Sequence, residues 1–438
     1  MGELKRKILV VSTSFPKTRG DGLSPFLWEF CLHLSKLGWE ITALVPHHRG
    51  LPVYEEWDRI KIRRFRYLPE RFEDVGYSGG IMPNIKSKPW KMIKLPFYII
   101  AMYREALNLA IDENYDIVNF HWLFPASFWL GQFARSSGIP VVLTGHGTDI
   151  LLASQGIFKK IADRTLPKAT AVTVNSEYMK SRLAKNKLPA NVEAIYVGVD
   201  SEKFRPGTNP PSSSQTVLYV GRLIKQKGIG LLIDAFVELK KQFPDARLQL
   251  IGYGVEKENI TGIIKTHGIE SSVSFVDTLP HDSLPEIYRR ARVLVLPSIV
   301  PEGLGLTPAE AGLCGVPCIT FGLGGTSEIV VNNKTGLIVG QSSTELSNAL
   351  IKLFQDNQFT DELGRNARVH LENFISWPKV TARYNTLFSA ILESQKLKPQ
   401  RISNMAKYVI GIIITFTTTA YFAKLFIDRF ARLMSIFK

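Results

Sequence analysis

The sequence is poor in cysteine, with Cys31, Cys314 and Cys318 as the only three in 438 residues. Three cysteines cannot form a disulfide framework, which argues against a small secreted fold held by disulfides. Cys314 and Cys318 have no histidine cluster near them, so a zinc site is not indicated. We expect the cysteines to be small buried residues of a protein kept in a reducing compartment.

Acidic residues are also scarce, with 39 Asp and Glu against 54 Lys and Arg, for a net charge of +15. This excess suits an anionic membrane, a nucleic acid or a phosphorylated ligand. The sequence has no zinc-finger spacing, recognition-helix pattern or aromatic-basic RNA motif, so nucleic acid is not expected as a partner. The first apolar run, 8–11, is only four residues long and too short for a signal peptide. We therefore expect the body of the protein inside the cell.

What is present is an alternation of short apolar runs with helix-length segments, which predicts β–α–β units and parallel sheets. The polar, proline-rich stretch 209–215 separates two such halves. We therefore predict an α/β protein with two Rossmann-like, doubly wound domains, the length being too great for one core. The expected boundaries are 1–199 for the first domain, 200–215 for a linker, 216–373 for the second domain, 374–395 for a closing helix and 396–438 for a basic tail.

Two carboxylates, Glu302 and Glu310, lie on either side of a predicted strand-to-helix junction. The run 293–298 reads as a buried parallel strand, and Pro308 suits the first turn of the following helix. Ligands bind at the carboxyl ends of strands in such sheets, and a helix start offers free N–H groups to a diphosphate. A solvated acidic loop is the alternative for this pair taken alone.

Cations and glycines occupy other predicted strand ends. Arg222 and Lys227 follow the strand 217–220, where an arginine can fork onto a phosphate and a lysine acts as a point charge. The loop 14–22 carries Gly20 and Gly22, which would let the backbone approach a phosphate. Its glycines do not fit the dinucleotide fingerprint G-x-G-x-x-G. Surface cations and an ordinary turn are the alternatives.

Histidines stand at two further strand ends, His121 and His146, and His146 lies between two glycines that leave room for a ligand. A lone histidine is usually structural, but this position favours contact with a ligand.

Taken together, these motifs resemble the retaining glycosyltransferases of the GT-B fold, specifically family 4. The resemblance covers residues 7–395 and rests on Glu302-x7-Glu310, the G-R-L-x-x-x-K-G spacing from 221 to 228, the His146 to Asp149 motif, the segment 195–200 and the closing helix. It implies a nucleoside-diphosphate sugar held between the domains, with no cofactor and no metal.

The resemblance also implies roles for single residues. Arg222 and Lys227 would neutralise the diphosphate, Glu302 would approach the sugar hydroxyls, and Glu310 would bind the ribose. His146 would bond a sugar hydroxyl, and His121 and Asp149 would lie on the acceptor side. Base contacts are expected near Tyr253, 279–281 and 322–325, with UDP and GDP both open. The remaining expected donor-binding residues are Gly20, Gly22, Gly303, Leu304, Gly305 and Leu306.

Two regions suggest a membrane. Segment 59–94 holds ten Lys or Arg against three Asp or Glu, with aromatic residues interleaved. One interpretation is a solvated face with core aromatics. The other is a surface that meets anionic lipid headgroups or a lipid-diphosphate acceptor. The resemblance favours this surface, because the N-terminal domain binds the acceptor in family 4.

Residues 408–423 carry no charge and as a helix would rise about 24 Å, short of a bilayer core of about 30 Å. We expect 408–438 to attach the protein to the cytoplasmic face of a membrane, spanning it or lying in its plane. A buried core helix is the alternative.

The expected activity is therefore transfer of a sugar, with retention and without a metal, to a lipid-linked, glycolipid or polysaccharide acceptor. A soluble acceptor and a non-catalytic scaffold of the same fold are the alternatives.

Overall fold

A computed structural model describes residues 6–396 apart from 20, 22–23, 78–80 and 278, and not 1–5 or 397–438. The N-terminal half forms an eight-stranded sheet in the order β3-β4-β2-β1-β5-β6-β7-β8. All neighbours are parallel except β3, which pairs antiparallel with β4 at one edge. The strands are β1 (Lys7–Ser12), β2 (Glu40–Pro46), β3 (Tyr54–Trp57), β4 (Ile60–Phe65), β5 (Ile117–His121), β6 (Val141–Gly145), β7 (Ala171–Val174) and β8 (Val192–Ala194).

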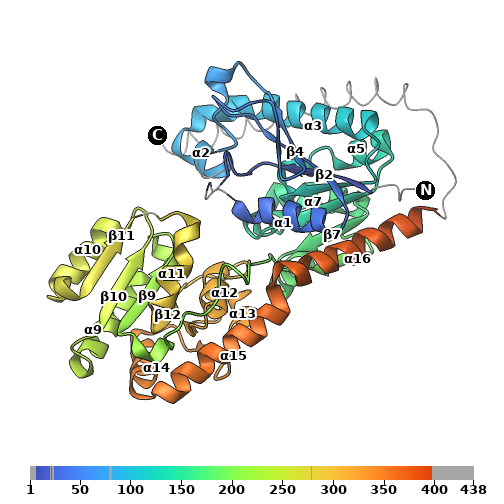
Figure 1. The fold of residues 1–438 in the computed structure, drawn as a ribbon. Coiled ribbons are helices and arrows are strands. Elements are labelled where there is room, and N and C mark those ends of the chain that lie inside the picture. Colours follow the sequence, from blue (N-terminus) through green and yellow to red (C-terminus); the bar gives the residue numbers. More distant parts are fainter. Residues whose placement is uncertain (1–5, 20, 22–23, 78–80, 278, 397–438) are drawn as a thin grey trace.

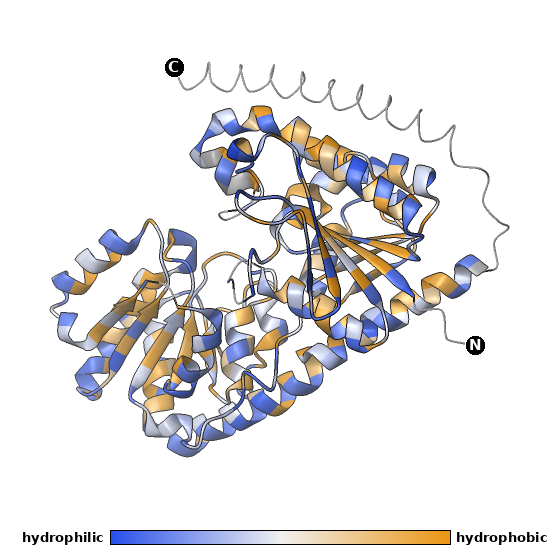
Figure 2. Cartoon of the chain, turned by 45° about the horizontal axis from the view of Figure 1, so that its top comes forward, coloured by the Kyte–Doolittle hydropathy of each residue, from blue (hydrophilic) through white to orange (hydrophobic). Residues whose placement is uncertain are grey.

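Helices cover both faces of this sheet (Figure 1). Ile8 and Val10 of β1 belong to the core under α1 (Pro25–Lys36), whereas Leu9 and Val11 belong to the core under α3 (Leu95–Asp112) and α5 (Leu130–Ser137). Because both faces are buried, inner strands such as β1, β6 and β7 are mostly apolar, whereas β3 and β4 at one edge carry charged residues (Figure 2). The shorter helical segments are α2 (Ile81–Ser87), η2 (Pro89–Lys94), α4 (Leu123–Ala126), α6 (Thr148–Ala153), α7 (Gly156–Thr165) and α8 (Glu177–Leu183).

The C-terminal half forms a six-stranded parallel sheet in the order β11-β10-β9-β12-β13-β14. In both sheets the first strand of the domain lies inside the sheet, and the strand order reverses beside it. This reversal is the topological switch point of doubly wound folds. The strands are β9 (Thr216–Val220), β10 (Arg247–Ile251), β11 (Val273–Val276), β12 (Val293–Leu296), β13 (Cys318–Thr320) and β14 (Gly336–Ile338). The helices include α9 (Ile229–Gln242), α10 (Lys257–Thr266), α11 (Leu284–Arg289), α12 (Leu306–Leu313), α13 (Thr326–Ile329) and α14 (Ser343–Gln355).

Two long helices end the described chain. α15 (Asn357–Ile375) packs on the C-terminal domain, and α16 (Trp377–Lys396) lies beside α1 on the N-terminal domain (Figure 1). Trp39 Nε1 donates to Asn385 Oδ1 at 2.8 Å, which fixes α16 to the N-terminal domain. One apolar cluster runs from the N-terminal sheet through α16 into the C-terminal domain, so the two domains share part of their core.

The predicted fold class is confirmed: two parallel-sheet α/β domains, each Rossmann-like. The three cysteines are free and buried. The expected membrane segment 408–438 lies outside the described residues. Within the described part, no helix combines the length and the apolar character that a membrane crossing requires.

Candidate active site

The carboxyl ends of the two sheets face each other, and Gly303 lies where they meet. A Cβ atom at Gly303 would lie 3.5 Å from the carbonyl oxygen of His146 and 3.8 Å from Cα of Gly147. Ser176 Oγ donates to the Gly303 carbonyl at 2.6 Å. Loops that follow β6 and β7 of one domain therefore contact the loop that follows β12 of the other. Any ligand at this edge contacts both domains.

Lys227 and Glu302 form an ion pair at this edge. Lys227 Nζ lies 2.6 Å from Glu302 Oε1, and Ser298 Oγ donates to the same oxygen. The two charged side chains are only 15% and 20% exposed, so solvent screens the pair less than it would on the surface. The structure thus brings Lys227 and Glu302 together, a pairing that no signal in the sequence indicates.

Arg222 lies on the same loop as Lys227, directly after β9. Its side chain is exposed, and its carbonyl accepts a hydrogen bond from Tyr219 Oη at 2.8 Å. Among the described residues its guanidinium has no hydrogen-bond or ion-pair partner. The structure therefore holds the backbone of Arg222 in place and leaves its charge available for a ligand.

A glycine turn supports the Glu302 loop. Glu302 N donates to Leu323 O at 3.1 Å, and Gly325 N donates to Glu302 O at 2.9 Å. Gly324 has φ 73°, and a Cβ atom there would come within 2.3 Å of Glu302 O. Only glycine lets the backbone at 324 come this close to the Glu302 carbonyl. The 322–325 turn therefore holds the Glu302 backbone in position.

Glu310 is buried and its carboxylate is hydrogen-bonded at both oxygens. Tyr288 Oη donates to Oε2 at 2.8 Å, and His281 Nε2 lies 2.9 Å from Oε1. Burial, and then the charge of Glu310, raise the pKa of Tyr288 well above its usual value, so this hydroxyl stays protonated as a donor. The sequence marked 279–281 only for base contacts and gave no signal for Tyr288.

The helix that carries Glu310, α12, begins without a side-chain cap. Its N-cap residue is Gly305, with φ 95°, and no side chain bonds the first N–H groups. Leu304 is buried, whereas Gly303, Gly305 and Leu306 are partly exposed at this helix start. Uncapped N–H groups at a helix start can bind an anion, and the Lys227–Glu302 pair lies at the loop that leads into this helix.

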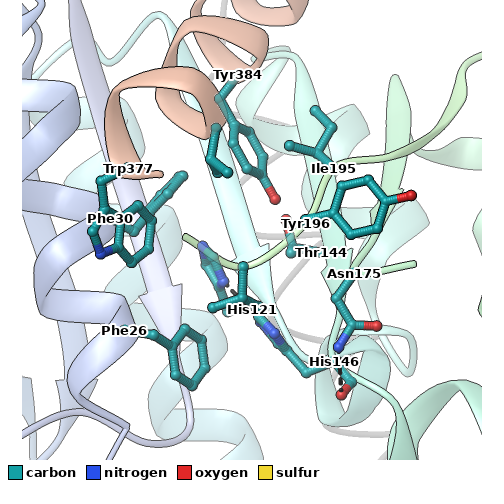
Figure 3. A pocket seen from close by; sticks show the side chains of 12 residues that line it. Phe26, Phe30, His121, Thr144, His146, Asn175, Ile195, Tyr196, Trp377 and Tyr384 are labelled. Atoms are coloured by element: carbon teal, nitrogen blue, oxygen red, sulfur yellow. Dashed lines mark hydrogen bonds between the residues drawn. The ribbon is translucent and has the colours of Figure 1, made fainter. Parts of the chain in front are cut away.

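His146 and His121 form a stacked pair at the ends of β6 and β5, with His121 buried and His146 partly buried (Figure 3). His121 Nδ1 lies 3.0 Å from His146 Nε2, and the ring planes are 16° apart. Burial lowers the pKa of His146 to about 3 and that of His121 well below its usual value, so both rings are neutral at neutral pH. Among the described residues, His146 Nδ1 has no hydrogen-bond partner. A neutral His146 is a poor base, and its Nδ1 is covered by the surrounding protein in this structure. The pair borders a cavity of about 20 Å³, room for roughly one water, whose other lining side chains include Phe26, Phe30, Asn175, Trp377 and Tyr384.

Asp149 and His121, expected on the acceptor side, are both buried and contact the loop or the ring of His146. Asp149 is buried, and its carboxylate accepts from the backbone N–H groups of Leu123 at 2.8 Å and His146 at 3.0 Å. It therefore anchors the loop that carries His146. His121 is also buried and supports His146 from behind. Gly20 and Gly22, expected to face the diphosphate, lie outside the described residues.

Glu328 is a site residue that the sequence did not single out. It lies on α13, after the glycine turn, and its oxygens accept from the N–H groups of Glu177 and Tyr178 at 2.8 and 2.9 Å. Tyr196 Oη donates to it at 2.8 Å. One carboxylate of the C-terminal domain thus binds the start of α8 in the N-terminal domain.

Two family models match the chain in succession. One, described as Glycosyltransferase Family 4, matches residues 20–203, and the other, Glycosyl transferases group 1, matches residues 200–370. Together they cover both domains and well over half of the chain. The chain belongs to glycosyltransferase family 4. The family expected from Glu302, Glu310, Arg222 and Lys227 is confirmed.

Curated relatives and solved structures agree with this family. The GDP-mannose-dependent alpha-(1-6)-phosphatidylinositol monomannoside mannosyltransferase of Mycobacterium tuberculosis is 26% identical, over 88% of this chain and 97% of the relative. The N-acetyl-alpha-D-glucosaminyl L-malate synthase of Bacillus anthracis is 25% identical, over 75% of this chain and 88% of the relative. The sucrose-phosphate synthase of Thermosynechococcus elongatus superposes with a TM-score of 0.71 at 21% identity, over 89% of this chain and all of that one, which shows the shared fold.

Proposed function

We propose that this glycosyltransferase moves a hexosyl group from a UDP- or GDP-linked sugar to a lipid-linked, glycolipid or polysaccharide acceptor at the cytoplasmic face of a membrane. The observation that carries the donor assignment is the Lys227–Glu302 pair at the loop that leads to the uncapped start of α12, with Arg222 exposed on the same loop as Lys227. Two cations and free N–H groups together fit a diphosphate.

The same groups account for catalysis. As the bond between sugar and diphosphate lengthens, negative charge collects on the diphosphate, and Arg222, Lys227 and the α12 N–H groups stabilise it. A bound diphosphate competes with Glu302 for Lys227. Glu302 then becomes free to accept hydrogen bonds from the sugar hydroxyls, so the ion pair in the structure keeps both residues positioned until the donor arrives.

Retention and metal independence belong to this proposal. The acceptor hydroxyl attacks from the face that the diphosphate leaves, and the leaving phosphate takes its proton, so no pair of glycosidase carboxylates is needed. The protein supplies the positive charge that a metal would otherwise provide. The anomeric configuration of the product, read by NMR, and turnover in excess EDTA test these two features.

Two relatives illustrate the choice of acceptor class. The mycobacterial relative is named for a phosphatidylinositol mannoside acceptor, whereas the Bacillus anthracis relative is named for malate, a soluble acid. The uncharged run 408–423, with basic residues on both sides, favours a membrane-bound acceptor. Attachment through 408–438 is part of the proposal.

The deciding experiment measures nucleotide release from a panel of UDP- and GDP-sugars, with and without membrane lipid extract. Release from one donor that lipid stimulates, and that Arg222→Ala and Glu310→Ala abolish, would establish the function. Lys225→Ala is the control, because Lys225 is an exposed cation on the same loop. Release that malate or another soluble acid stimulates, and lipid does not, would favour the soluble acceptor. No release from any donor would contradict the catalytic proposal.

A further inference from the structure

Three large apolar side chains project from one side of the N-terminal domain. Trp90, Ile93 and Phe97 are 58%, 71% and 54% exposed. They lie on the continuous run of η2 and α3, at spacings of three and four residues, which places them on one helical face. Isolated exposed apolar residues are common on protein surfaces, but an aligned group of this size marks an interaction site.

The structure holds Trp90 in this outward position. Lys94 is buried, and its Nζ donates to Asp74 Oδ1 at 2.8 Å and to Phe72 O at 3.0 Å. The same nitrogen lies 4.5 Å from the centroid of the Trp90 ring. This cation–π contact supports the indole from the protein side and leaves its other side exposed.

Exposed cations border the apolar residues. Lys88 precedes Trp90 by two positions, and Arg104 follows Phe97 by two helical turns on the same side of α3. Arg71 is exposed as well, with its guanidinium carbon 4.8 Å from the ring centroid of the half-exposed Phe72. An apolar stripe with basic residues at its edges is the pattern of a helix that lies in a membrane interface.

The structure shows which part of segment 59–94 can form the expected lipid-facing surface. Phe65, Tyr67 and Tyr77 are buried, so the first part of the segment belongs to the core. Arg64 is buried and pairs with Glu55. The exposed aromatic side chains of the segment are therefore Phe72 and Trp90, and the apolar surface at Trp90 continues into α3.

We infer that the face formed by Trp90, Ile93 and Phe97, with Lys88, Arg71 and Arg104 beside it, docks the N-terminal domain onto an anionic lipid bilayer. Charge selects this occupant. The chain's own segment 396–438 carries eight Lys or Arg and one Asp, so like charges oppose its settling on this face. A second copy of the face would be repelled for the same reason, whereas anionic lipid attracts both the face and the tail.

The docking face is connected to the candidate active site. The segment that carries it begins where β4 ends, at the carboxyl edge of the sheet. Tyr77, buried in this segment, donates to Pro46 O at the end of β2, and Lys17 Nζ of the loop after β1 lies 5.4 Å from its ring centroid. Docking would therefore bring the edge that carries His146 toward the bilayer, which is where the proposed acceptor resides. The docking inference does not depend on the proposed function, and only the link to a membrane-bound acceptor does.

Trp90 itself provides the test, because it is the one exposed tryptophan of the seven, all of which the structure describes. Full-length protein is mixed with phosphatidylcholine vesicles, with or without phosphatidylglycerol, and the spectrum of Trp90→Phe is subtracted from that of the wild type. We expect the Trp90 emission to shift to the blue and to be quenched by brominated acyl chains only when phosphatidylglycerol is present. High salt should weaken both effects.

Two results would overturn the inference. One is a Trp90 emission that stays water-like while the protein sediments with the vesicles, since the tail alone would then attach it. The other is a blue-shifted emission before vesicles are added, since the tail or a second copy would then cover the face.

A matched pair of variants completes the experiment. Ile93→Asn with Phe97→Asn should reduce Trp90 quenching roughly tenfold at limiting lipid. Val369→Asn is the control, because Val369 is 62% exposed on α15 of the other domain and should leave the quenching unchanged. Nucleotide release without lipid should be the same in all of these proteins. Normal nucleotide release without Trp90 quenching in the wild type would contradict the docking inference alone. Normal Trp90 quenching without nucleotide release from any donor would contradict the proposed function alone.

Discussion

Tyr196 Oη donates a hydrogen bond to Glu328 Oε2 at 2.8 Å, and this bond joins the end of the N-terminal domain to the C-terminal domain. The same carboxylate also accepts from two backbone N–H groups at the start of α8. Three donors on one domain thus converge on one charged acceptor of the other. Because Glu328 follows the glycine turn that supports Glu302, it links the approach of the domains to the position of the donor loop.

Replacing Glu328 should open the two domains. Glu328→Gln removes the charge and turns one acceptor into a donor that faces other donors. Hydrogen bonds to charged groups contribute about 1.5–3 kcal/mol each, so we expect kcat/KM for the donor sugar to fall at least tenfold. Small-angle X-ray scattering should show a larger radius of gyration.

Glu372→Gln is the matched control for this variant. This substitution removes the same charge from the C-terminal domain. Glu372, however, pairs with Arg368 within α15 and not with the other domain. It should leave both kcat/KM and the scattering curve unchanged. Equal behaviour of the two variants would show that Glu328 does not control domain approach.

Two lysines of the short helix η5 (Lys225–Lys227) should differ in their effect on turnover. Lys227 pairs with Glu302, whereas Lys225 is exposed. Removing a charge that stabilises the leaving diphosphate costs about 3 kcal/mol, so Lys227→Gln should lower turnover roughly a hundredfold. Lys225→Gln should stay near wild type. Calorimetry with free UDP and GDP should show weaker binding for Lys227→Gln alone, and equal losses in both variants would point to overall charge instead.

The fold and the strand-end residues could be predicted from the sequence because their signals are local. Strands buried on both faces appear as short apolar runs such as β1 and β12, and the residue after each run must lie at the carboxyl edge. The sequence therefore predicts that Lys227, Glu302 and His146 lie at the carboxyl edges of their sheets. The turn after β13 was found in the same way, from its glycines.

The partners of those residues could not be predicted, because they depend on contacts distant in sequence. Tyr288 is 22 positions from Glu310, and Glu328 is 132 positions from Tyr196. Asp149 looked like a ligand contact by motif, yet only the folded chain shows that its carboxylate is used by two backbone N–H groups. Composition likewise cannot tell that Phe65 is buried while Trp90 is exposed.

Tyr288 should position Glu310 for the nucleotide. Tyr288→Phe removes the hydroxyl that donates to Glu310 Oε2 and leaves a buried carboxylate oxygen without that donor. We expect a loss of stability of about 1–3 kcal/mol together with weaker nucleotide binding, measured by thermal unfolding and calorimetry. Tyr115→Phe is the control, since this buried hydroxyl is hydrogen-bonded to Thr42 Oγ1 and Glu113 Oε2 in the N-terminal domain. It should reduce stability without changing nucleotide affinity, and a nucleotide affinity that survives Tyr288→Phe would contradict the positioning role.

Acidification should destabilise the N-terminal domain through His146. Burial lowers its pKa from 6.5 to about 3 in the folded protein, so between these values the unfolded chain binds the proton and the folded chain does not. The stabilising contribution is complete above pH 6.5 and decreases as the pH falls toward 3, with a loss of about 2 kcal/mol between pH 7 and pH 5. Urea unfolding followed by tryptophan fluorescence measures it, because the seven tryptophans lie in the N-terminal domain and α16. His146→Gln should remove about this much of the pH dependence. If the variant shows the same pH dependence as the wild type, His146 binds its proton equally well in the folded and unfolded protein, and burial does not lower its pKa.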